Sequence, residues 1–176
     1  MRKIVILFIL IMAVVVIISL PKNGDRQKTV VAVGLKGPAF SLSELDIGGT
    51  GAQKTWTFSD LQGTVVFINY WATWCKECRE EMPSMQRLYD RMQGKPFQML
   101  TILYRDDPKR AVTYMKENGY TMPVLLDPDT DLAFSYGVTG VPETYVADKE
   151  GVIREKIIGP RHWDDPGSTV VIESLL

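Results

Sequence analysis

The only two cysteines of this 176-residue chain, Cys75 and Cys78, stand three positions apart, a spacing that suits redox chemistry. They follow the apolar run 65–68 and precede a stretch with helical periodicity. Cys75 is therefore expected at a helix N-terminus, where unpaired backbone N–H groups and the helix dipole favour the thiolate. Cys78 is expected about one turn deeper, where it can resolve a mixed disulfide. The pair predicts a complete dithiol–disulfide cycle.

Paired cysteines also occur in three other kinds of site. Haem attachment requires a histidine directly after the second cysteine, and Arg79 stands there instead, so this interpretation is excluded. A structural zinc site needs four Cys or His ligands, and a chain with two cysteines and one histidine needs a partner chain to complete one. A purely structural disulfide stays open, although a bridge that closes so short a loop restrains little of the unfolded chain.

The elements that must position the cysteines follow from the hydrophobic pattern. Buried strands are predicted at 65–68, 97–103 and 124–126, and shorter strands at 40–45 and 55–58. Helices are predicted between them, over 82–92 with a stop at Gly94, over 107–119, and briefly before Gly137; a hairpin follows at 144–147 and 152–158. Alternating strands and helices predict one α/β domain with a central mixed sheet and helices on both faces.

The N-terminus carries a different signal. Residues 4–20 are apolar except for Ser19 and follow Arg2 and Lys3, and seventeen helical residues just span a hydrocarbon core. A cleaved signal peptide is the alternative, but the run is long for one and lacks a small-residue cleavage site. The predicted organisation is a transmembrane signal-anchor at 1–21, a linker at 22–36, the α/β domain at 37–163 and a C-terminal tail at 164–176.

Two motifs carry a family resemblance. The segment Asn-Tyr-Trp-Ala-Thr-Trp-Cys-Lys-Glu-Cys at 69–78, with Gly-Val-Thr-Gly-Val-Pro-Glu-Thr-Tyr at 137–145, resembles the membrane-anchored, thioredoxin-like TlpA, ResA and CcmG (DsbE) proteins of bacteria. The resemblance runs from about Gly37 to Gly159. It implies a thioredoxin-like fold, with Cys75 as the nucleophile, Cys78 as the resolving thiol and a redox-active disulfide between them. It also implies that Pro142 is a cis-proline lying against that disulfide.

The resemblance assigns further site residues. Glu81 matches the acidic residue that ResA-like proteins keep beside the cysteines, and Asn69 stands where thioredoxin has a buried aspartate. The predicted substrate-binding residues are Trp74, Val141, Pro142 and Glu143. Plainer alternatives exist for the two acids, because Glu81 could belong to a solvated helix face and Glu143 could be an ordinary strand-edge residue. No role is assigned to His162, Trp163 or the tail.

The predicted function is a membrane-tethered thiol–disulfide oxidoreductase on the bacterial cytoplasmic membrane, single-pass, with its domain facing the periplasm or cell exterior. The expected direction is reduction of disulfides in exported proteins, with a membrane electron donor restoring the dithiol. The family resemblance further implies apocytochrome c as a target. No cofactor or metal is expected, and 20 basic against 21 acidic residues argue against nucleic-acid binding. An oxidant of secreted proteins and a non-catalytic peptide-binding module are the alternatives.

Overall fold

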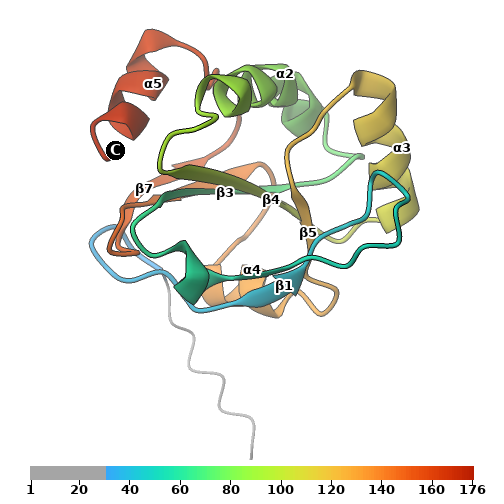
Figure 1. Ribbon diagram of the computed structural model, residues 1–176, viewed down its shortest axis with the longest axis horizontal. Helices are drawn as coiled ribbons and strands as arrows, with labels where there is room; N and C mark the ends of the chain where they lie inside the picture. Colours follow the sequence, from blue (N-terminus) through green and yellow to red (C-terminus); the bar gives the residue numbers. More distant parts are fainter. Residues whose placement is uncertain (1–30) are drawn as a thin grey trace, which may run out of the picture.

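A computed structural model describes residues 31–176, and Figure 1 shows their arrangement. The elements in chain order are β1 (Ser41–Ser43), β2 (Thr55–Thr57), η1 (Phe58–Leu61), β3 (Val65–Trp71), α2 (Lys76–Arg91), β4 (Phe97–Leu103), α3 (Pro108–Asn118), β5 (Val124–Leu126), α4 (Asp131–Tyr136), β6 (Glu143–Ala147), β7 (Ile153–Ile158) and α5 (Pro166–Glu173). The predicted anchor and the first part of the predicted linker lie outside the described residues. Among the helices of residues 31–176, none is both long and apolar enough to cross a bilayer.

The central sheet has five strands in the order β5-β4-β3-β6-β7. Strands β3, β4 and β5 run parallel, whereas β6 is antiparallel to both β3 and β7, so the sheet is mixed as predicted. All seven residues of β3 are buried, because this strand has a neighbour on each side and a layer over each face. The strand that leads to the cysteines is therefore enclosed along its whole length.

Successive residues of β3 point into two separate cores. Phe67 packs on one face with residues of α2, α3 and α5, and Ile68 packs on the other with residues of α4 and the N-terminal segment. Figure 1 shows α2 and α5 on one side of the sheet and α4 on the opposite side. Helices on both faces are thus confirmed. Met82 and Met85, at helical spacing in α2, are core side chains on the first of these faces.

Helix α3 shows how local sequence sets the element boundaries. Asp107 caps the helix by accepting a hydrogen bond from the Lys109 amide at 2.8 Å, and Pro108 follows at the first helical position. Gly119 ends it with a φ of 67°, a conformation that costs glycine nothing. Both ends lie where the sequence predicts them.

Two segments outside the predicted domain pack on it. Residues 31–36, assigned to the linker, include Val31 in the core, and the amide of Ile153 in β7 donates to the Leu35 carbonyl at 2.9 Å. In the tail, Pro166 opens α5, because the first helical turn needs no amide donor, and Ile172 enters the core.

Candidate active site

Cys75 and Cys78 form a disulfide at the N-terminus of α2, with their Cα atoms 5.3 Å apart. Cys75 is the N-cap residue, and the Cys78 amide donates to the Cys75 sulfur at 3.1 Å. That amide and the helix dipole both stabilise negative charge on the Cys75 sulfur once the disulfide is reduced. Cys75 is 4% exposed and Cys78 is fully buried, so Cys75 is the sulfur that a partner reaches first.

The loop before β6 lies directly against this disulfide. The Val141–Pro142 peptide bond is cis, as the resemblance implies. The Val141 carbonyl oxygen is 3.5 Å from the Cys75 sulfur, and the Val141 side chain is half-buried. The two motifs, more than sixty residues apart in sequence, therefore meet at one edge of the sheet.

Trp74 stands beside the disulfide with 56% of its surface exposed, where an apolar face of a partner protein can cover it. Its indole N–H donates to the Arg105 carbonyl at 3.3 Å. The preceding residue, Thr73, donates both its amide and its hydroxyl to one oxygen of Asp106, each at 2.6 Å. The loop between β4 and α3 thus holds the cysteine loop in place.

Asp106 is a site residue that sequence reasoning missed, although a signal for it existed. The parallel strands β3 and β4 end at the same edge of the sheet, and Asp106 follows β4 as the cysteine loop follows β3.

Substrate contact by Trp74, Val141 and Pro142 stays a prediction, and their clustering around Cys75 agrees with it.

Glu81 lies one helical turn beyond Cys78 and is 2% exposed, so the solvated-face interpretation is wrong. Asn69 in β3 donates its side-chain amide to one carboxylate oxygen at 2.8 Å. The other oxygen accepts the Arg161 amide and the Trp163 indole N–H, each at 3.2 Å. Burial raises the pKa of Glu81 to about 7, and these three neutral donors only partly offset it. A carboxyl with this pKa exchanges protons near neutral pH.

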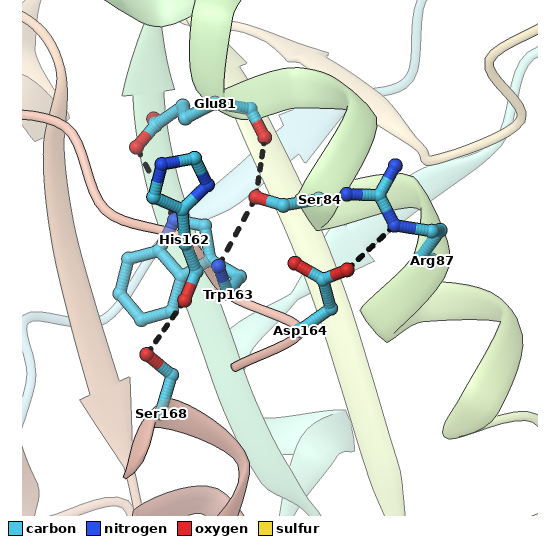
Figure 2. A network of polar contacts seen from close by, with 7 residues as sticks. All are labelled: Glu81, Ser84, Arg87, His162, Trp163, Asp164 and Ser168. Carbon is cyan, nitrogen blue, oxygen red and sulfur yellow. Dashed lines mark hydrogen bonds and ion pairs between the residues drawn. The ribbon is translucent and has the colours of Figure 1, made fainter. Parts of the chain in front are cut away.

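Two of these three donors come from a segment to which the sequence analysis gave no role. Figure 2 shows His162 and Trp163 beside Glu81, with the Ser84 side chain of α2 linking the helix to the Trp163 backbone. No spacing signal links residues 80 positions apart. The residue type offered a weaker hint, because a buried tryptophan generally needs a partner for its N–H group.

Glu143 also differs from its prediction. It is fully buried in β6, an interior strand of the sheet, so the strand-edge interpretation is wrong. Its carboxylate is 3.0 Å from the Lys156 ammonium, accepts the Thr139 amide at 3.3 Å and accepts the Tyr145 hydroxyl. These contacts bury the Glu143 carboxylate next to the cis-proline, and its predicted role in substrate binding stays a prediction.

Lys76, the cation at the start of α2, is exposed and paired with an acid. The Lys76 ammonium lies 3.4 Å from the Glu80 carboxylate, and both side chains are exposed. Within residues 31–176, no group of three or more His, Cys, Asp or Glu side chains is arranged to hold a metal ion. The arrangement places the slightly exposed Cys75 sulfur in front, the buried Cys78 sulfur behind it, and the buried Glu81 carboxyl one turn further along α2.

Comparison with known proteins places this geometry in a family. The sequence profile of the AhpC/TSA family matches residues 33–156. The chain is 34% identical over 143 residues to the thiol-disulfide oxidoreductase ResA of Geobacillus thermodenitrificans, covering 81% of this chain and 79% of that protein. It is 37% identical over 129 residues to the thiol:disulfide interchange protein DsbE of Pseudomonas aeruginosa, covering 72% of this chain and 67% of that protein.

Solved structures of thiol:disulfide interchange proteins have the same fold as this chain. A putative thiol:disulfide interchange protein DsbE from Chlorobium tepidum superposes with a TM-score of 0.67 at 26% identity, over 82% of this chain and 95% of that one. A second thioredoxin family protein from Chlorobium tepidum reaches a TM-score of 0.70, also at 26% identity, over 82% of this chain and 99% of its own. The similarity thus includes most of both chains.

Proposed function

Since the chain belongs to the thioredoxin-like AhpC/TSA family and is a thiol–disulfide oxidoreductase, we propose that it works as a reductant of disulfides in exported proteins. The observation that carries this direction is the buried Glu81, whose partners are all neutral. Strong oxidants of this type owe their potential to a stabilised reduced form with a very acidic thiol. A carboxylate one turn from Cys78 opposes thiolate formation and therefore favours the disulfide in this protein.

The reaction proceeds in two exchange steps. The Cys75 thiolate attacks one sulfur of the target disulfide, which forms a mixed disulfide and releases the first target thiolate. Glu81 then accepts the Cys78 thiol proton, and the Cys78 thiolate attacks the Cys75 sulfur. The Cys75–Cys78 disulfide forms, the second target thiolate leaves, and two electrons have passed to the target. An external dithiol donor at the membrane restores Cys75 and Cys78.

Apocytochrome c is the proposed target, because the family resemblance stated above implies it. Its haem-attachment segment carries two cysteines separated by two residues, and haem attachment requires both as thiols. Such a segment is short and extended when unfolded, which suits the surface formed by Trp74, Val141 and Pro142. An oxidised peptide with this cysteine spacing is the direct probe, and a peptide with a long-range disulfide is its control.

The proposal also includes a membrane anchor and a location for the domain. The apolar segment 4–20 acts as an uncleaved anchor in the bacterial cytoplasmic membrane, with the domain facing the periplasm or cell exterior. Fractionation of the full chain, with protease added outside intact cells, tests both statements. Recovery in the soluble periplasmic fraction with a shortened N-terminus contradicts the anchor.

The decisive experiment is the reduction potential of the Cys75–Cys78 couple, measured by thiol trapping in redox buffers. A reductant is expected below about −200 mV, whereas an oxidant lies near about −120 mV. A Cys78→Ala variant tests the exchange chemistry separately, because it should accumulate covalent adducts through Cys75. Target capture that survives Cys75→Ala instead indicates a peptide-binding module.

A further inference from the structure

The segment 161–164 is held against α2 and α5 by its own set of contacts, which Figure 2 shows. The Trp163 amide donates to the Ser84 hydroxyl at 3.0 Å, and that hydroxyl donates to the Glu81 carbonyl at 2.7 Å. The Arg87 guanidinium contacts the Asp164 carboxylate at 2.6 Å. On the other side, the Ser168 hydroxyl of α5 donates to the His162 carbonyl at 2.7 Å. Both ends of the segment are therefore fixed.

The Trp163 side chain is fixed as firmly as its backbone. It is 1% exposed, and its ring meets Phe67 of β3 edge to face with the centroids 4.7 Å apart. Its only polar atom, Nε1, points at the Glu81 carboxylate at 3.2 Å. A rigid ring that presents one donor to a buried carboxylate contributes both to the orientation of that carboxylate and to its hydrogen-bonding energy.

We propose that Trp163 is a positioning residue for Glu81, and that the C-terminal segment thereby sets how readily Glu81 accepts the Cys78 proton. The inference deepens the proposed function and rests on the role given there to Glu81. It also gives a purpose to the tail, because Ser168 and the buried Ile172 of α5 hold the Trp163 segment in place.

The other groups that face Glu81 leave Trp163 as its main side-chain partner besides Asn69. A pocket of about 140 Å³ beside Glu81 is lined by Glu80, Pro160, Arg161 and His162. The Arg161 side chain donates to the Ser168 hydroxyl at 2.8 Å, and only its backbone amide reaches Glu81. From β3 and β6 come the neutral Asn69 and Thr144, which bond each other at 2.9 Å. The ionisable neighbours are thus Cys78, Glu80, Arg161 and His162.

The first test uses the oxidised full chain without substitution. The four tryptophan indole N–H signals, labelled with ¹⁵N, are followed by NMR between pH 5 and pH 9. The Trp163 signal is expected to titrate with a midpoint near that of Glu81, about 7. The Trp71 signal is the internal control, because its buried N–H has no hydrogen-bond partner among the described residues. A Trp163 signal that stays flat overturns the proposal.

The second test is Trp163→Phe, which keeps an aromatic ring and removes the donor. The reduced full chain is mixed with a small aromatic disulfide. In the first phase, one aromatic thiol is released as Cys75 attacks the disulfide. In the second phase, the other aromatic thiol is released as Cys78 attacks the mixed disulfide on Cys75. The pH midpoint of the second phase is expected to rise by about one unit, a slowing of about tenfold well below pH 7. The midpoint of the first phase should stay unchanged.

Trp71→Phe is the matched control, because Trp71 is equally buried in the same core and its loss removes no bond to Glu81. An equal midpoint shift in both variants overturns the positioning role. In Glu81→Gln, adding Trp163→Phe should shift nothing further. Because this reaction needs no protein target, a wild-type potential near that of an oxidant refutes the proposed function alone, whereas an unshifted Trp163→Phe profile refutes only this inference.

Discussion

Two buried glutamates, Glu81 and Glu143, lie on opposite faces of the same sheet and have different kinds of partner. Glu81 faces the core under α2 and accepts hydrogen bonds from an amide side chain, a backbone amide and an indole. Glu143 faces the other core and has the Lys156 ammonium at 3.0 Å. Burial alone therefore does not decide what a carboxylate does.

Glu81 and Glu143 differ because the groups that donate hydrogen bonds to them differ in charge. The Lys156 ammonium offsets the charge of the buried Glu143 carboxylate, so this pair serves structure. Neutral donors orient a carboxylate but offset burial only in part, and the pKa of Glu81 accordingly rises to about 7. In the proposed function Glu81 exchanges protons with the thiols, whereas Glu143 holds the loop that carries Pro142.

The largest expected effect comes from removing the cation of the structural pair. Lys156→Met leaves the Glu143 carboxylate buried without its counter-ion and should lower the free energy of unfolding by about 4 kcal/mol. Urea unfolding at pH 7 measures it. Lys95→Met, which breaks the half-exposed pair with Glu173, is the control and should cost less than about 1 kcal/mol. Equal losses would contradict the distinction between the two pairs.

The proton-exchanging acid should make stability depend on pH. The pKa of Glu81 is about 7 when folded and about 4.5 when unfolded, so the folded state binds more protons between these values. The free energy of unfolding should therefore fall as pH rises from 4.5 to above 7, by about 3 kcal/mol from this group. Glu81→Gln should remove that part of the slope. An unchanged slope, measured by urea unfolding of the oxidised protein, would contradict the raised pKa.

The same substitution should slow the chemistry. Glu81→Gln removes the proton acceptor for Cys78, and the second phase of reaction with a small aromatic disulfide should slow about 100-fold at pH 8. Its pH midpoint near 7 should disappear. Glu143→Gln is the comparison: it should lower stability and leave that midpoint in place. A midpoint lost in both variants would mean that the two acids are not functionally distinct.

The smallest effect is expected at the surface. Lys76 lies next to Cys75, but its ammonium is exposed and pairs with Glu80. Lys76→Ala should change the free energy of unfolding by less than about 0.5 kcal/mol and the rate of the first phase by less than about threefold. Stopped-flow measurements at low and high salt check this. A larger change would show that an exposed charge controls Cys75 as strongly as the helix terminus does.

Much of the frame was predictable because it depends on local pattern. The buried strand before Cys75, the capped helix that Asp107 opens and the terminal hairpin all lie where periodicity and turn residues put them. The cysteine pair could be recognised as a redox pair from its spacing and from its place at the start of a helix. The cis bond before Pro142 came from the family resemblance, since local sequence does not fix that isomer.

The sequence by itself determined the two reactive sulfurs, their place at a helix N-terminus and the α/β frame, because these depend on neighbours within a few residues. Only the tertiary structure decided which acid is free of cations. Glu81 meets Trp163 across 82 positions, whereas Glu143 meets Lys156 across one strand pairing. The proton affinity of a buried carboxylate depends on whatever the fold packs around it, and no local pattern records that environment.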